Sequence, residues 1–156
     1  MITIPIPGWG NLDVEAIVFD LNGTLATDGK IPSPVKERIK SLTEKVTVYI
    51  LTTDTQGTAD EQMRGLDVEL VKIAGQESQK GKFEFLTTLD LEKTVVLGNG
   101  SNDQLILKEG ALGIAVLGEE GLSASAMKHA DLVVKNIVDA FDLFLKPKRL
   151  IATLRE

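Results

Sequence analysis

Short apolar segments alternate with amphipathic ones along this chain, and this alternation limits the possible folds more than any other feature of the sequence. Apolar runs of four to eight residues are typical of strands buried on both faces of a sheet. Val14–Phe19 is the first such segment. Strands are expected at Val14–Phe19, Val46–Leu51, Val68–Ile73, Thr94–Leu97, Leu112–Val116 and Leu132–Val134.

Amphipathic segments lie between these runs. Ser33 followed by Pro34 is typical of a helix start, with serine as N-cap and proline at the first helical position. Further helices are expected at Gly57–Arg64, Gln79–Leu89, Asn102–Glu109, Ser123–His129 and Asn136–Leu145. Strand–helix alternation predicts a three-layer α/β/α sandwich with a mainly parallel, Rossmann-like sheet. We expect residues 1–156 to form a single domain with its core at about 14–145 and a C-terminal tail at 146–156.

Polar clusters follow three of the predicted strands. They are Asp20–Thr24 after the first, Thr52–Asp54 after the second and Gly98–Asp103 after the fourth. Ligands of parallel α/β sheets bind beyond the carboxyl ends of the strands. The sequence therefore places its main polar clusters where such a fold binds its ligand.

Phosphoryl transfer is the chemistry that these clusters favour. A carboxylate such as Asp20, at a strand end before a glycine turn, can act as a nucleophile toward phosphorus when Mg²⁺ offsets the repulsion between two anions. A hydroxyl of Thr52 or Thr53 could hold a phosphate oxygen. A lysine would balance the developing negative charge. Lys82 fits this role, and Lys80 is the alternative.

The ordered set Asp20–Thr24 (DLNGT), Thr52, Lys82 and Gly98–Asp103 (GNGSND) resembles the haloacid dehalogenase-like phosphatase superfamily. GNGSNDQLILKEGALGIAVLG, which begins at Gly98, is similar to the phosphorylation domain of P-type ATPases. So is LTTD, which ends at Asp54, beside the LTGD of that group. The resemblance covers roughly residues 14 to 145 and fits best the small soluble P-type-ATPase-like proteins.

The resemblance implies roles for individual residues. Asp20 would become an aspartyl-phosphate, and Thr52 and Lys82 would hold the phosphoryl group. Asn22 stands at the position of the usual general acid and base. The metal ion would be Mg²⁺. Its implied surroundings are the Asp20 side chain, the Asn22 backbone carbonyl, Asn99 and, beside it, Asp103, which would support either the metal or the lysine. Thr24, Thr53 and Asn102 are further candidates for contact with the substrate.

Two positions differ from the pattern of most superfamily phosphatases. Where they have a second aspartate, this chain has Asn22, and an amide cannot exchange a proton with the leaving group or water. General acid–base help contributes about 10²–10⁴-fold to such reactions. Asn99 replaces a metal-binding aspartate and removes one negative charge. We therefore expect a slow enzyme that works best on good leaving groups such as acyl, aryl or nucleotide phosphates.

No cap domain is expected, because one helix and one strand fill each gap between the first three motifs. An open site could accept a small phosphate ester, an acyl phosphate or a phosphoprotein, or a second copy of the chain could cover it. Two alternatives to an enzyme stay open. One is a regulatory module that binds Mg²⁺ and phosphate without turnover. The other is a phosphoacceptor that docks on another protein.

Other classes of protein fit the sequence less well. With a net charge of −6, the chain is a poor partner for nucleic acid or anionic membranes. It has no cysteine, which excludes thiolate metal sites, and no apolar run approaches the roughly 20 residues of a membrane span. We expect a soluble cytoplasmic protein. No P-loop and no complete dinucleotide-binding glycine motif is present.

Overall fold

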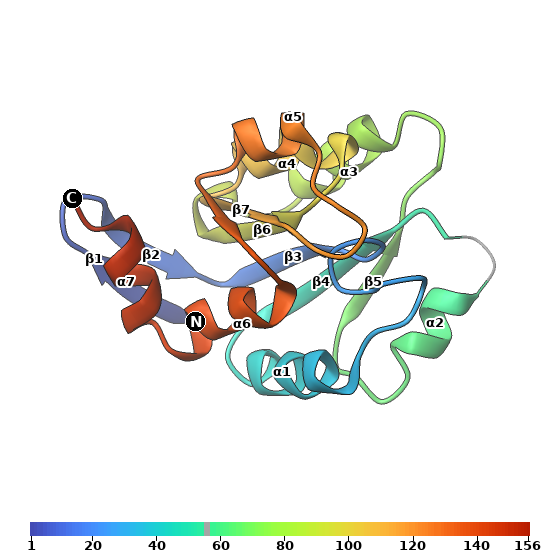
Figure 1. Cartoon of the computed structure of the whole chain (residues 1–156), viewed down its shortest axis with the longest axis horizontal. Helices are drawn as coiled ribbons and strands as arrows, with labels where there is room; N and C mark the ends of the chain where they lie inside the picture. Colours follow the sequence, from blue (N-terminus) through green and yellow to red (C-terminus); the bar gives the residue numbers. More distant parts are fainter. Residues whose placement is uncertain (55–56) are drawn as a thin grey trace.

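A six-stranded parallel sheet is the centre of the computed structural model, which describes residues 1–54 and 57–156 (Figure 1). The strand order is β5-β4-β3-β6-β7-β8, and each neighbouring pair is parallel. The strands are β3 (Ala16–Asp20), β4 (Thr47–Thr52), β5 (Glu69–Lys72), β6 (Thr94–Gly98), β7 (Leu112–Val116) and β8 (Leu132–Val134). The predicted parallel sheet is confirmed, and the ends of β3, β4, β5 and β6 differ from the predicted bounds by one or two residues.

Helices cover both faces of this sheet, which makes the three predicted layers (Figure 1). One face packs against α1 (Ser33–Thr43) and α6 (Ile137–Leu145), through side chains such as Ile39 and Phe141. The other face packs against α3 (Ser78–Leu86), α4 (Gln104–Glu109) and α5 (Ala124–His129). A short α2 (Thr58–Gln62) precedes β5, and the 3₁₀ turns η1 (Leu91–Lys93) and η2 (Ser101–Asp103) flank β6.

An N-terminal hairpin, which was not predicted from the sequence, precedes the parallel sheet. β1 (Ile2–Ile6) and β2 (Gly10–Val14) form a separate two-stranded antiparallel sheet. Its alternate side chains, such as Ile4 and Leu12, are buried in the larger core. The C-terminal tail forms α7 (Lys148–Leu154), which packs on this hairpin at the left of Figure 1. The first predicted strand therefore begins too early, because Val14 belongs to β2 and Glu15 separates it from β3.

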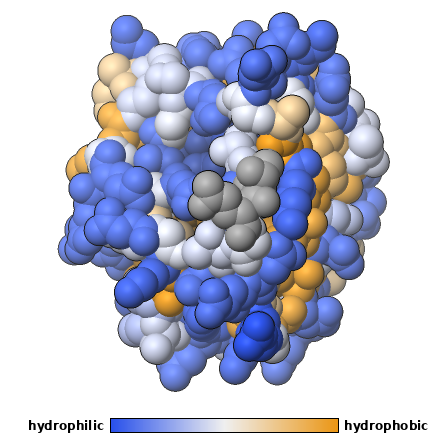
Figure 2. Space-filling model, turned by 90° about the vertical axis from the view of Figure 1, so that its right-hand side faces the viewer, coloured by the Kyte–Doolittle hydropathy of each residue, from blue (hydrophilic) through white to orange (hydrophobic). Residues whose placement is uncertain are grey.

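The order of the strands determines where a ligand can bind. β3 is central, and the chain continues to β4 on one side and reaches β6 on the other. Such a change of direction leaves a crevice at the carboxyl ends of the strands. The side of the molecule at the right of Figure 1 has a mostly hydrophilic surface, with the largest group of apolar side chains at the right of the view and smaller groups at the left (Figure 2). Among the described residues, no helix is long and apolar enough to span a membrane.

Candidate active site

Asp20 is the last residue of β3 and lies between the ends of β4 and β6. It pairs in register with Leu51, so Thr52 is the next residue of β4, and Phe19 pairs with Leu97 just before Gly98. Asp20 is only 7% exposed. The fold thus brings the first, second and last predicted motifs to one edge of the sheet.

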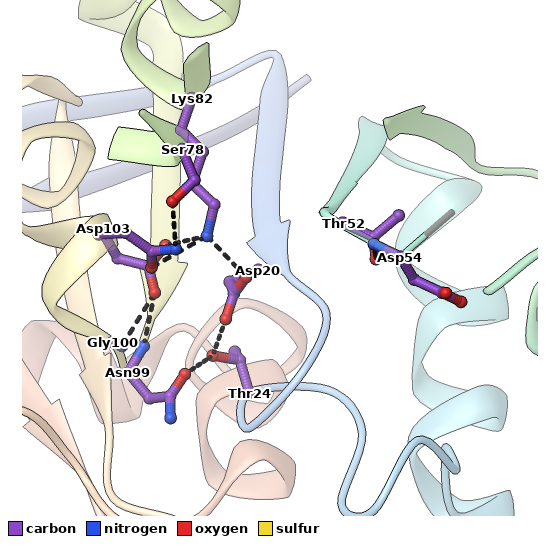
Figure 3. A network of polar contacts seen from close by, with 10 residues as sticks. Asp20, Thr24, Thr52, Asp54, Ser78, Lys82, Asn99, Gly100 and Asp103 are labelled. Carbon is purple, nitrogen blue, oxygen red and sulfur yellow. Dashed lines mark hydrogen bonds and ion pairs between the residues drawn. The ribbon is translucent and has the colours of Figure 1, made fainter. Parts of the chain in front are cut away.

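Lys82 reaches Asp20 from α3 and is itself almost fully buried (Figure 3). Its Nζ donates to Asp20 Oδ1 at 2.9 Å, Asp103 Oδ1 at 2.8 Å and Asn102 Oδ1 at 3.2 Å. An ammonium group has three N–H donors, so these contacts use all of them. Lys80, the alternative, is exposed on the same helix.

Asp103 is fully buried and anchors the lysine to the last motif. Its Oδ1 accepts from Lys82, while Oδ2 accepts from the backbone N–H groups of Asn99 at 3.1 Å and Gly100 at 3.0 Å. Gly98 allows this close packing, because a Cβ there would meet Asp103 side-chain atoms at 2.6 Å. Both carboxylate oxygens are thus engaged, and the residue contacts the lysine, one of the two roles that the resemblance implied.

Asn102 connects the lysine to Ser78, a residue that was not predicted from the sequence. Its Nδ2 donates to Ser78 Oγ at 3.0 Å, and its Oδ1 accepts from Lys82. Ser78 lies four residues before Lys82 on α3, and residues at this spacing share one helix face. This spacing was the available signal in the sequence.

Thr24 and Asn99 lie on the other side of the Asp20 carboxylate (Figure 3). The Thr24 hydroxyl is 3.1 Å from Asn99 Oδ1 and 3.4 Å from Asp20 Oδ2, so its one proton has two acceptors. The Asn99 Nδ2 donates to the Gly121 carbonyl at 3.2 Å, and its amide oxygen faces the Thr24 hydroxyl. Gly23, with φ of +83°, lies so close to Asn99 that a Cβ would collide with its amide.

Asn22 differs from these residues because it is exposed. It lies in a tight loop in which the Leu21 carbonyl accepts from the N–H groups of Thr24, Leu25 and Ala26 at 3.3, 3.0 and 2.9 Å. The loop therefore holds the backbone of Asn22 beside Asp20 and leaves its side chain in solvent.

Thr52 and Asp54 lie apart from the lysine cluster in Figure 3. Thr52 is buried at 1% exposure, and its Oγ1 accepts from the Asp54 N–H at 3.0 Å. Asp54 Oδ2 in turn accepts from the Ala59 N–H of α2 at 3.0 Å, which connects Asp54 to that helix. Thr53 is half-buried next to them. Neither threonine contacts Lys82 in the hydrogen bonds of the described residues.

The charges in this cluster perturb one another. Burial, followed by the negative charge of Asp103, raises the pKa of Asp20 to about 7, although Lys82 and Thr24 act in the opposite direction. Burial alone would lower the pKa of Lys82, but Asp20 and Asp103 outweigh it and the pKa is raised. The lysine therefore stays charged at neutral pH, and an additional cation near Asp20 would favour its carboxylate form.

The oxygen atoms beside Asp20 fit a small hard cation. Asp20 Oδ2 and Asn99 Oδ1 both face the Thr24 hydroxyl, and the Asn22 backbone lies in the adjoining loop. Carboxylate, amide and backbone carbonyl oxygens with several waters are typical ligands of Mg²⁺. No group of three His, Cys, Asp or Glu side chains suited to a metal exists among the described residues. Neutral oxygens would thus supply most of the protein ligands.

Comparisons with known proteins identify the fold. A structure of a putative HAD superfamily (subfamily III A) hydrolase from Legionella pneumophila has a TM-score of 0.72 to this chain, at 17% identity over 90% of this chain and 87% of that one. The chain has the haloacid dehalogenase-like (HAD) fold. The 3-deoxy-D-manno-octulosonate 8-phosphate phosphatase of Moraxella catarrhalis, solved with magnesium, phosphate and KDO, matches this HAD fold with a TM-score of 0.70 at 15% identity, over 91% and 94% of the two chains.

Sequence relatives agree with the fold. The chain is 48% identical over 65 residues to the uncharacterized protein MJ0073 of Methanocaldococcus jannaschii, 42% of this chain and 70% of that protein, and belongs to the same family. It is 28% identical over 143 residues to a soluble P-type ATPase-like phosphatase of that organism, 89% of this chain. The chain spans 52% of the length of this phosphatase. No protein-family model matches. The resemblance to HAD proteins and to soluble P-type-ATPase-like ones is thereby confirmed.

Proposed function

We propose that this chain is a Mg²⁺-dependent phosphohydrolase that works slowly through a phosphoenzyme on Asp20. The observation that supports this most is the buried row Asp20–Lys82–Asp103 at the end of the central strand. Burial of two carboxylates and an ammonium is costly for a fold. The proposed reaction explains this cost, because it needs a lysine next to the carboxylate that would receive the phosphoryl group.

The first step would form a bond between an Asp20 carboxylate oxygen and phosphorus. The bond between phosphorus and the leaving oxygen breaks at the same centre, and its electron pair departs with that oxygen. Lys82 balances negative charge on the phosphoryl oxygens in the transition state. Asn22 has no proton to donate, so the leaving group departs as an anion or takes a proton from water. Acyl and aryl phosphates, whose leaving groups are stable anions, are therefore the favoured substrates.

The second step would hydrolyse the aspartyl-phosphate. Water attacks phosphorus, the bond to the Asp20 oxygen breaks, and inorganic phosphate is released. The proton lost by water goes to phosphate or solvent, because the Asn22 amide cannot accept it. Loss of general base help of about 10²–10⁴-fold makes this the slow step.

The metal site would consist of Asp20, the Asn22 carbonyl and Asn99, with Asp103 behind them. Bound Mg²⁺ would lower the repulsion between the phosphate and the carboxylate. Asp103 supports this site indirectly, since its Oδ2 holds the backbone N–H of Asn99. The magnesium and phosphate bound to the phosphatase of Moraxella catarrhalis support a divalent cation in this fold.

Phosphate release from acetyl phosphate tests the proposal. Wild type and Asp20→Asn are compared with and without Mg²⁺, beside the spontaneous hydrolysis of the compound. We expect Mg²⁺-dependent release by wild type and none above background by the variant. Equal release by both proteins would contradict the assignment of Asp20 as nucleophile.

A module that binds Mg²⁺ and phosphate without turnover is the second candidate. The observation in its favour is that two amides, Asn22 and Asn99, lie where charged groups would speed turnover. This candidate predicts that Mg²⁺ with inorganic phosphate raises the thermal unfolding midpoint while no substrate is hydrolysed. Release of phosphate by wild type but not by Asp20→Asn would exclude it. Coverage of the open site by a second copy stays a prediction.

A further inference from the structure

Ser78 lies outside the residues that the proposed function uses, yet two successive hydrogen bonds through Asn102 connect it to the lysine. It is half-buried at the start of α3, and its Oγ accepts from Asn102 Nδ2 at 3.0 Å (Figure 3). Asn102 Oδ1 accepts from Lys82 Nζ at 3.2 Å. Ser78 and Lys82 come from one helix, whereas Asn102 comes from η2 on the other side of the cluster.

We propose that Ser78 is a positioning residue, which acts through Asn102 to hold the Lys82 ammonium in line with Asp20. This inference rests on the proposed function, since it concerns the lysine of the same site. A primary amide has a donor end and an acceptor end. With the donor end of Asn102 at Ser78, the acceptor end must face the lysine. A flipped amide would turn N–H groups toward an ammonium that can only donate.

The three partners of Lys82 differ in how firmly they are held. Asp103 is fully buried, and its second oxygen is fixed by two backbone N–H groups. Asp20 is the group whose charge and bonding change when a phosphoryl group is attached. Asn102 is therefore the partner whose orientation determines whether the lysine keeps its direction through the reaction. Ser78 supplies the side-chain contact that sets that orientation.

This geometry also assigns Asn102 a role different from the substrate contact that the resemblance implied. Its amide oxygen faces a cation, and one N–H is already donated to Ser78. A phosphate oxygen needs a donor. In this orientation Asn102 accepts from the lysine, and the lysine is the group that would donate to the phosphate.

The neighbouring residue offers a matched control. Gln79 Oε1 accepts from Gln104 Nε2 at 3.0 Å, a side-chain bond that also joins α3 to the segment after β6. Gln79 is half-buried like Ser78, but its contact does not lead to Lys82. Gln79→Ala therefore removes a comparable link between the same parts of the fold and leaves the lysine cluster intact.

The experiment compares wild type, Ser78→Ala, Ser78→Thr and Gln79→Ala by two readouts. The first is kcat and KM for Mg²⁺-dependent hydrolysis of acetyl phosphate. The second is the NMR spectrum of the Lys82 ε-methylene group in ¹³C-labelled protein, assigned through the backbone, where an immobilised side chain has two resolved Hε signals. The second readout needs neither metal nor turnover.

We expect Ser78→Ala to lower kcat by about two- to tenfold, the range for loss of one hydrogen bond, with little change in KM. The Hε signals of Lys82 should merge. Ser78→Thr keeps the hydroxyl, so its kcat should stay within about twofold of wild type, a smaller change than loss of the hydrogen bond would cause. Gln79→Ala should match wild type in both readouts.

Two results would overturn the proposal. One is that Ser78→Ala leaves the Lys82 signals and kcat unchanged, and the other is that Gln79→Ala changes both as much as Ser78→Ala does. If wild type releases no phosphate, the proposed function fails, and the Lys82 signals decide this inference alone. Signals that merge in Ser78→Ala but not in Gln79→Ala would then still support it, and unchanged signals would refute it.

Discussion

The two sides of the Asp20 carboxylate are built differently. On the α3 side, Lys82 and Asp103 are almost fully buried, and every N–H of the lysine has an acceptor. On the solvent side, Asn22 is exposed, and its side chain is an amide. The buried half can stabilise charge without reorganising, while the exposed half lacks a group that moves a proton. This contrast fits a site that forms a phosphoenzyme more readily than it hydrolyses one.

Supplying the missing proton carrier should have the largest effect. Asn22→Asp places a carboxyl beside Asp20 at an exposed position, so we expect turnover of acetyl phosphate to rise by about 10²-fold or more. Steady-state phosphate release at saturating Mg²⁺ measures this. Asn11→Asp, at an exposed position on β2, makes the same charge change and should leave turnover unaltered. An equal or lower rate for Asn22→Asp would refute our account of position 22.

Removal of Lys82 should lower the stability of the buried side of the site. Lys82→Met leaves Asp20 and Asp103 buried without the ammonium that pairs with both, and loss of one partner from a buried ion pair costs about 3–5 kcal/mol. The free energy of unfolding in urea tests this. Lys80→Met on the same helix removes an exposed lysine and should change stability by less than about 0.5 kcal/mol. Similar losses of unfolding free energy in the two variants would show that the buried cluster contributes no more to stability than an exposed lysine does.

The raised pKa of Asp20 predicts how stability depends on pH in the absence of metal. The folded protein keeps a proton on Asp20 up to about pH 7, whereas the unfolded chain loses it near the ordinary value of 3.8. Wild type should therefore lose stability as pH rises between these values. Asp20→Asn does not titrate, so its advantage should grow from pH 4 to pH 7 and then level off.

Thermal unfolding midpoints of wild type and Asp20→Asn across this range provide the measurement. Asp67→Asn is the control, because Asp67 is exposed and outside the cluster. A constant difference between wild type and Asp20→Asn at all pH values would contradict the pKa of about 7.

The smallest effect is expected at Asn99. Asn99→Asp replaces the Nδ2 donor to the Gly121 carbonyl by an oxygen, which should lower stability without metal by about 1–3 kcal/mol. The added charge should tighten Mg²⁺ binding, so Mg²⁺ should raise the unfolding midpoint of the variant more than that of wild type. Midpoints with and without Mg²⁺ separate the two effects. An identical response to Mg²⁺ would argue against Asn99 as a metal ligand.

Much of the fold could be predicted because apolar runs and helix periodicity are local signals. Leu112–Val116 and Leu132–Val134 have the predicted bounds. The hairpin of β1 and β2 was not predicted, although three isoleucines alternate with Thr3 and Pro5 before a glycine-containing turn. Its burial depends on α7, which lies at the other end of the sequence, and a local pattern cannot supply that contact.

Within the site, helix phase could have decided between the two lysines. Ser78, Lys82 and the buried Leu86 recur at intervals of four on α3, which places Lys82 on the inner face and Lys80 outside it. The distribution of partners could not be predicted in this way. Asp103 accepts from the lysine with one oxygen and from the backbone with the other. This arrangement depends on the close packing of Gly98 against Asp103, which is visible only in the structure.

The lifetime of a phosphoenzyme tests the central claim most directly. Wild type, Asn22→Asp and Asp20→Asn would be mixed with acetyl phosphate and Mg²⁺, quenched in acid at successive times and weighed by intact-protein mass spectrometry. We predict that wild type accumulates one phosphoryl group on Asp20, that Asn22→Asp loses this group much faster, and that Asp20→Asn never gains it. Absence of a phosphoryl group on wild-type Asp20, or equal lifetimes in wild type and Asn22→Asp, would contradict the account.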